Sequence, residues 1–228
     1  MQSAERWLKA FLRYEFEDVD LLRRALTHRS APGRSNERLE YLGDAVLDFV
    51  ISEAVYRRRP TASEGDLSRL RAHLVRDASL AAIAHDAGLG EHLLLGGGEK
   101  KSGGHRRDSI LADALEALFA AVYLDGGFDA AREVIMAVFA AHLDTLPDAE
   151  DLRDPKTRLQ EWLQARGRGL PEYTLESVSG KAHQQQFEIR CTAGDEALTT
   201  SGRGSSRRAA EQEAARRMLE ALVGGRRE

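Results

Sequence analysis

The sequence predicts two domains of different fold class, an all-α N-terminal domain and a small α+β C-terminal domain. In the first 143 residues, every periodic stretch repeats apolar residues at three- and four-residue steps, which is the spacing of one helix face. Beyond residue 156, short segments alternate apolar and polar residues as strands do. Residues 156–228 contain 13 Lys/Arg and 10 Asp/Glu, whereas the rest contains 20 and 27. This asymmetry indicates two domains with different partners.

The clearest helical pattern of the first domain follows Asn36, which is placed to act as its N-cap. Leu39, Val46 and Val50 recur on one face, and Pro60 marks the end of the helix. Further helices are predicted over about 63–87, 107–125 and 129–143. The glycine-rich stretch 96–104 is predicted to be a mobile loop.

Residues 144–155 are polar and contain two prolines, which is typical of a linker. A helix is then predicted over 156–166, strands over 173–178, 186–192 and, more weakly, 197–201, and a last helix over 205–223. The order α-β-β-β-α predicts a small domain whose helices pack on one face of the sheet. We set the boundaries at 1–147 for the first domain, 148–154 for the linker and 155–225 for the second.

Composition excludes several classes of protein. Cys191 is the single cysteine, so an internal disulfide and a cysteine zinc site are excluded, and we expect it to be a packing residue. No apolar run reaches the ~18 residues of a membrane span, and the first residues lack the pattern of a secretory signal. We therefore expect a cytoplasmic protein with no membrane partner.

Acidic residues recur on one face of two predicted helices. Glu37, Glu40 and Asp44 are spaced i, i+3, i+7, and Asp113 and Glu116 are spaced i, i+3. Like charges at these spacings repel, and a hard divalent cation such as Mg²⁺ would relieve the repulsion. Spacing alone favours a solvated helix face, because about one such triple is expected by chance in a chain of this composition.

The surroundings of the acids argue against that simpler interpretation. Asp113 lies inside the very apolar run 110–122, where a surface carboxylate is unexpected. A di-iron carboxylate bundle would also place acids in helices, but it requires Glu-x-x-His, which the sequence lacks. A carboxylate site for Mg²⁺ is the remaining prediction.

Three segments of the first domain resemble the conserved blocks of the ribonuclease III family, and the second domain resembles a double-stranded-RNA-binding domain. The first three are 36–47 (NERLEYLGDAVL), 64–72 (EGDLSRLRA) and 108–117 (DSILADALEA). The last three are 154–161 (DPKTRLQE), 180–183 (GKAH) and 202–211 (GRGSSRRAAE). The blocks follow one another in family order and cover essentially the whole chain.

The resemblance implies an all-α endonuclease domain that forms a homodimer and uses Mg²⁺, with Mn²⁺ as a substitute, to cut double-stranded RNA. It implies that the metal-binding acids are Glu40, Asp44, Asp113 and Glu116. Asp44 and Glu116 would be the catalytic pair, whereas Glu37 and Glu64 match family acids with secondary roles. The expected products carry 5′-phosphates, 3′-hydroxyls and short 3′ overhangs, and the expected substrates are precursors of ribosomal RNA and some messengers.

The second domain supplies candidate contacts to an RNA duplex, which proteins recognise through 2′-hydroxyls, phosphates and shape. The residues that match the pattern of the domain are Thr157, Gln160, Glu161, His183, Ser205, Arg207 and Arg208. In the first domain, His28 matches a family motif, and we expect it to be a hydrogen-bonded structural histidine. The stretch 96–104 lacks the spacing of a phosphate-binding loop, so no nucleotide cofactor is predicted.

Two other functions remain open at this point. A protein that binds duplex RNA without cutting it would share the second domain but would lack one or more of the four acids. A purely structural protein would use its helical domain for dimerisation alone. That function would not explain why acids lie within apolar helices.

Overall fold

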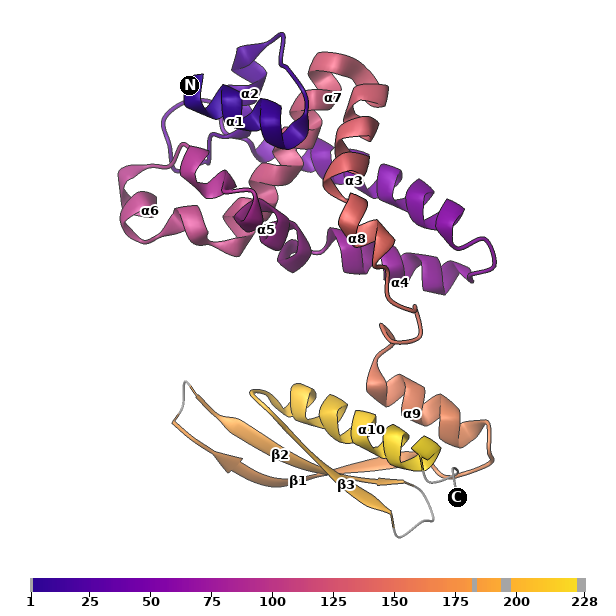
Figure 1. The fold of residues 1–228 in the computed structure, drawn as a ribbon. Coiled ribbons are helices and arrows are strands. Elements are labelled where there is room, and N and C mark those ends of the chain that lie inside the picture. Colours follow the sequence, from indigo (N-terminus) through magenta and orange to yellow (C-terminus); the bar gives the residue numbers. More distant parts are fainter. Residues whose placement is uncertain (1, 182–183, 194–197, 225–228) are drawn as a thin grey trace. The chain divides into compact units, whose positions relative to one another are not determined.

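The computed structural model describes residues 2–181, 184–193 and 198–224, and it divides the chain into two compact units. Unit 1 is Met1–Leu152 and unit 2 is Arg153–Glu228. The first unit is helical, and the second has the order α-β-β-β-α (Figure 1). The predicted fold classes are confirmed.

The first unit is built around one long helix. Its elements are α1 (Gln2–Leu12), α2 (Val19–Ala25), α3 (Glu37–Arg58), α4 (Glu64–Val75), α5 (Asp77–Asp86), η1 (Leu89–His92), α6 (Gly97–Lys101), η2 (Gly104–Arg106), α7 (Asp108–Val138) and α8 (Ala140–Asp144). Helix α7 packs against α1, α2, α3 and α5, and its Leu111, Leu115 and Phe119 are fully buried. Within the described residues, no helix combines the length and the apolar content needed to cross a bilayer.

Several helix boundaries differ from those expected. The predicted helix over 63–87 is two helices, because Arg76 has an extended backbone between α4 and α5. The two helices predicted over 107–125 and 129–143 are confirmed in α7, because Gly127 with φ 81° interrupts the helical geometry between them, but the second helix ends at Val138 and α8 follows it. Asn36 occupies the predicted N-cap position, but its side chain makes no capping hydrogen bond with any described residue.

The prediction of a loop over 96–104 is wrong, because most of this stretch is helical. This stretch contains α6 and the start of η2, and it packs against the segment that follows α2. The backbone N–H of Gly96 donates to Ser30 Oγ at 3.0 Å, and a Cβ at Gly96 would overlap the Ser30 carbonyl. Thr27 and Leu94 also form a parallel bridge. Here glycine permits close backbone packing, a role that sequence alone does not distinguish from flexibility.

The second unit is a three-stranded antiparallel sheet with two helices on one face (Figure 1). Its elements are α9 (Pro155–Gln164), β1 (Pro171–Ser179), β2 (Gln186–Ala193), β3 (Thr199–Gly204) and α10 (Arg207–Gly224). Asp154 caps α9 by accepting from the backbone N–H of Lys156 at 2.9 Å. Cys191 is fully buried in this core, and burial raises the pKa of its thiol to about 11. A thiol in that state packs as a small apolar side chain, as predicted.

Candidate active site and RNA-binding surface

Three of the predicted acids meet where α3 and α7 pack together. Glu40 of α3 and Asp113 and Glu116 of α7 each offer an oxygen, and these oxygens lie within 4.8 Å of one another. The close approach depends on Gly43, which is buried against the backbone of Glu116. A Cβ at that position would overlap the Glu116 carbonyl, so a larger residue would separate the helices. The glycine therefore allows acids from two helices to form one cluster.

The cluster is electrostatically unfavourable by itself. Burial, and then the charges of Asp44 and Asp113, raise the pKa of Glu116 to about 8. Burial is also the main cause that raises the pKa of Glu40 and of Asp113. Partly buried carboxylates that repel one another are stabilised by a hard cation, and carboxylate oxygens are the ligands that Mg²⁺ prefers. The donor set therefore fits a divalent cation of this class.

Asp44 lies at the edge of the cluster. Among the described residues it is not one of the three whose oxygens lie within 4.8 Å of one another, and its side chain is exposed. It is nevertheless close enough for its charge to raise the pKa of Glu116. Its position one turn after Glu40 on α3 puts it on the same face. The assignment of Asp44 as a metal-binding catalytic residue stays a prediction.

A cleft of about 490 Å³ opens beside Glu40 and Asp113. Its other lining residues are His28, Arg29, Ser30, Asn36, Glu37, Glu99, Arg107, Ser109 and Ile110. The His28 ring accepts at Nδ1 from the Ser30 backbone N–H at 3.2 Å, which is the hydrogen-bonded histidine expected from the sequence. Sequence reasoning did not single out Glu99, which lies in the glycine-rich stretch 96–104, or Arg107, which lies at the start of the helix predicted over 107–125.

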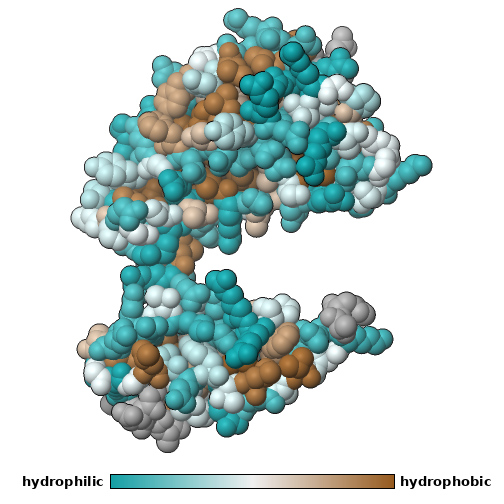
Figure 2. Space-filling model, turned by 180° about the vertical axis from the view of Figure 1, so that it is seen from behind, coloured by the Kyte–Doolittle hydropathy of each residue, from teal (hydrophilic) through white to brown (hydrophobic). Residues whose placement is uncertain are grey.

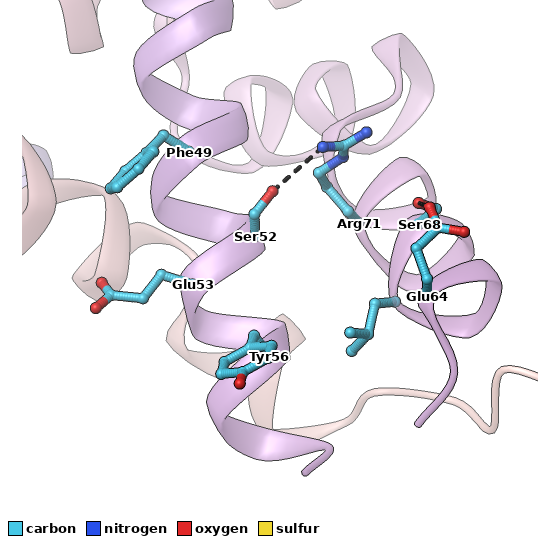
Figure 3. Close-up of a pocket in the computed structure, with 8 residues that line it drawn as sticks. Phe49, Ser52, Glu53, Tyr56, Glu64, Ser68 and Arg71 are labelled. Carbon is cyan, nitrogen blue, oxygen red and sulfur yellow. Dashed lines mark hydrogen bonds between the residues drawn. The ribbon is translucent and has the colours of Figure 1, made fainter. Parts of the chain in front are cut away.

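The two secondary acids lie in different places. Glu37 lines the cleft, and Arg29 Nη1 lies 3.8 Å from its carboxylate. Glu64 lines a separate groove of about 420 Å³ between α3 and α4 (Figure 3). There its carboxylate accepts from Ser68 Oγ at 2.9 Å. The structure therefore does not bring Glu64 into the cleft within one chain.

The predicted RNA contacts of the second unit lie on two helices and the turn before α10. Three exposed residues of α9 are Thr157, Gln160 and Glu161, and three exposed residues at the start of α10 are Ser205, Arg207 and Arg208. Glu161 pairs with Arg153 at 2.9 Å and Arg207 pairs with Glu211 at 3.0 Å. The Arg208 side chain is 82% exposed, which leaves its guanidinium the most accessible of these charges. His183 lies outside the described residues.

Both units match known protein families. Residues 18–143 match the ribonuclease-III-like family, and residues 155–222 match the double-stranded RNA binding motif. The chain is 56% identical over 222 residues to Ribonuclease 3 of Alkalilimnicola ehrlichii, covering 97% of each chain. It is 49% identical over 225 residues to Ribonuclease 3 of Vibrio vulnificus, covering 99% of this chain and 100% of that one.

Solved structures resemble the first unit. The nuclease domain of ribonuclease III from Campylobacter jejuni, in a crystal structure, is 42% identical with a TM-score of 0.59. It covers 62% of this chain, and the match covers 97% of that domain. A second structure of the same domain, with a TM-score of 0.58 and 44% identity, describes structural flexibility in a region involved in dimer formation. That match covers 59% of this chain and 95% of the other.

A carboxylate cluster on two packed helices, joined to a domain that binds double-stranded RNA, defines a double-strand-specific endoribonuclease. The chain belongs to the ribonuclease III family, in its bacterial form with one nuclease domain and one C-terminal RNA-binding domain. The predicted fold, family and activity are confirmed.

Proposed function

We propose that Glu40, Asp44, Asp113 and Glu116 bind Mg²⁺, or Mn²⁺ in its place, and that Asp44 and Glu116 are the residues on which hydrolysis most depends. The observation that carries this proposal is the convergence of Glu40, Asp113 and Glu116 within 4.8 Å. When bound, Mg²⁺ supplies activation of a water molecule and neutralises charge on the leaving oxygen. Asp44 is exposed beside these three and is accessible from solvent.

The packing of the two helices also holds the carboxylates of the cluster in place. Glu116 is the most strongly perturbed acid of the site, with a pKa of about 8, and it is held by the packing of α7 on α3. A fixed carboxylate set needs little reorganisation when a phosphodiester binds, which favours the transition state. Hydrolysis at such a site would leave a 5′-phosphate and a 3′-hydroxyl.

The first unit would act as a homodimer, with one site for each strand and short 3′ overhangs set by the distance between the two sites. Three aromatic side chains of α3 are exposed, Tyr41 at 82%, Phe49 at 60% and Tyr56 at 68%. Figure 2 shows apolar surface on this unit, and Figure 3 shows Phe49 and Tyr56 beside the groove between α3 and α4. Apolar surface of this kind marks a protein interface. The dimer-forming region described for the Campylobacter jejuni domain supports the same assembly.

The second unit would hold the RNA duplex through the exposed ends of α9 and α10. Polar side chains of α9 would reach 2′-hydroxyls in a minor groove, and Arg207 and Arg208 would contact phosphates. His183 would enter the next minor groove. We keep 1–147, 148–154 and 155–225 as the proposed boundaries of nuclease domain, linker and RNA-binding domain.

The proposed substrates are duplex regions in precursors of ribosomal RNA and in some messengers, and the proposed location is the cytoplasm. Bacterial members of the family that are about half identical over nearly the full chain support this assignment. A regulator that binds without cutting is not favoured, because all four acids of the proposed site are present.

The site is tested with Glu116→Gln and a matched control, Glu133→Gln, which changes an exposed acid on the same helix. A long RNA duplex is incubated with each variant, with and without Mg²⁺, beside single-stranded RNA and duplex DNA. We expect Glu116→Gln to lose cleavage and keep duplex binding, whereas Glu133→Gln cleaves duplex RNA like the unaltered chain. Cleavage by Glu116→Gln at the unaltered rate would refute the site.

A further inference from the structure

The wall of the cleft carries an ion pair between Glu99 and Arg107. Arg107 Nη1 lies 2.8 Å from Glu99 Oε1, and the Arg107 and Glu99 side chains are 50% and 19% exposed, respectively. Both residues line the same cleft as Glu40 and Asp113. The carboxylate is therefore largely enclosed, whereas half of the arginine side chain remains accessible beside the carboxylate cluster.

The packing around Glu99 fixes its carboxylate. Gly104 lies so close that a Cβ there would be 2.5 Å from Glu99 Cγ and 2.7 Å from Oε1. Ser102 Oγ donates to the backbone carbonyl of Glu99 at 3.1 Å and to its carboxylate oxygen Oε1 at 3.4 Å. The same segment is tied to Ser30 through the Gly96 N–H. A carboxylate held in this way fixes the direction of the guanidinium that it binds.

A positively charged side chain in this part of the cleft would offset the repulsion between the carboxylates of the site and an RNA strand. The cleft is lined by the carboxylates of Glu37, Glu40 and Asp113, which repel the phosphates of an RNA strand. Arg29 is the other guanidinium of the lining, but it is 73% exposed and lies 3.8 Å from Glu37, so it is held more loosely. A guanidinium has five N–H donors in a planar fork, and donors not used by Glu99 can bind a phosphate.

We propose that Arg107 contacts a backbone phosphate of the RNA strand bound in the cleft, and that Glu99 is the positioning residue that holds Arg107 there. The proposal deepens the proposed function and rests on it, because it requires the scissile strand to pass the carboxylate cluster. It assigns substrate binding to a segment outside the RNA-binding domain. Arg107 touches the substrate, whereas Glu99 acts through Arg107.

The test compares four variants of the full chain, Arg107→Ala, Arg107→Lys, Glu99→Gln and Arg106→Ala. Arg106 is the matched control, because it is the exposed neighbour of Arg107 and, among the described residues, is not part of the cleft lining. A defined RNA hairpin is cleaved at fixed Mg²⁺ over a series of salt concentrations, and kcat and KM are measured separately. Each phosphate contact contributes about one to the slope of log affinity against log salt.

We expect Arg107→Ala to lower kcat/KM about tenfold, mainly through KM, and to make the salt slope shallower by about one. Arg107→Lys should keep the slope, because it keeps the charge. Glu99→Gln should raise KM less than Arg107→Ala does, and Arg106→Ala should match the unaltered chain. If Arg107→Ala does not fold, Arg107→Gln provides the same comparison.

The proposal is overturned if Arg107→Ala has the KM and the salt slope of Arg106→Ala. It is equally overturned if Arg107→Ala and Glu99→Gln lower the melting temperature while the salt slope stays unchanged, because the ion pair would then be purely structural. Glu116→Gln separates failure of this proposal from failure of the proposed function. If Glu116→Gln still cleaves duplex RNA, the proposed active site is wrong. If Glu116→Gln is inactive, the active site is supported, whatever the result for Arg107.

Discussion

Gly43 of α3 lies directly against the backbone carbonyl of Glu116 of α7. The position is buried, and a Cβ there would overlap the carbonyl oxygen and carbon of Glu116. This contact sets the distance between the two helices at the level of the carboxylate cluster. Glu40 lies three residues before Gly43, so the same contact places its carboxylate beside Asp113 and Glu116. The packing of α3 on α7 and the geometry of the carboxylate cluster therefore both depend on the absence of a side chain at Gly43.

We predict that Gly43→Ala reduces both stability and cleavage. The added methyl group must push α3 away from α7, and overpacking of this kind costs about 1–3 kcal/mol. Thermal unfolding followed by circular dichroism should show a lower melting temperature, and cleavage of duplex RNA should fall at least tenfold. Gly98→Ala is the control, because a Cβ there meets no described atom within 4 Å. Unchanged activity in Gly43→Ala would show that the helix spacing tolerates the methyl group.

Binding of Mg²⁺ to the cluster should raise the melting temperature of the chain without any RNA present. A ligand that binds only the folded state at about 100 times its dissociation constant stabilises that state by about 2.7 kcal/mol. We expect this increase to be absent in Glu116→Gln and retained in Glu133→Gln. An equal increase in Glu116→Gln would place the bound metal elsewhere.

Tyr56→Arg should convert the proposed homodimer into a monomer. The Tyr56 side chain is 68% exposed and lines the apolar groove between α3 and α4. A charge buried at an interface without a partner is strongly unfavourable. Sedimentation velocity should show a dimer for the unaltered chain and a monomer for Tyr56→Arg. Val19→Arg, at an exposed apolar residue of α2, should remain dimeric. A dimeric Tyr56→Arg would exclude this face.

Local patterns were sufficient to predict most of the fold. The helical repeat predicted α3 and its end before Pro60, and the alternation of apolar residues predicted β1 and β2 within one or two residues. The acids were singled out by their helical spacing and by the apolar surroundings of Asp113, and the resemblance to the ribonuclease III family implied which of them bind metal. Each of these predictions rests on residues that are close together in the sequence, because their apolar pattern indicates which positions are buried.

Contacts between distant segments were not predictable in the same way. Gly43 and Glu116 are far apart in the sequence, and nothing in the residues around Gly43 indicates that it faces the Glu116 carbonyl. Gly104 similarly reads as a flexible residue, although it packs on Glu99. A glycine that makes a loop flexible cannot be distinguished in the sequence from one that allows two backbones to pack closely, because both roles depend on the lack of a side chain. The wall that carries Arg107 was therefore missed.

Asp125 joins α7 to the turn before α2, outside the active site. One carboxylate oxygen accepts from the Tyr14 hydroxyl at 2.8 Å and from the Glu17 N–H at 2.9 Å, and the other accepts from the Asp18 N–H at 2.8 Å. Burial acts to raise the pKa of Asp125, but these hydrogen bonds outweigh it and hold the pKa below its usual value. The folded state therefore favours the ionised carboxylate.

This shift predicts how stability depends on pH. A carboxyl group whose pKa is lower in the folded state stabilises the protein above its unfolded pKa of ~3.9, and the contribution is lost as the pH falls through the folded value. Asp125→Asn should therefore cost about 2 kcal/mol at pH 7, and this difference should shrink as the pH falls below ~4. The measurement is urea unfolding between neutral and acidic pH, followed by Trp7 fluorescence in a Trp162→Phe background, so that the first unit alone is observed. Asp129→Asn, at an exposed acid of α7, is the control. A cost for Asp125→Asn that stays constant across the pH range would show that its charge does not contribute, since a steric effect does not titrate.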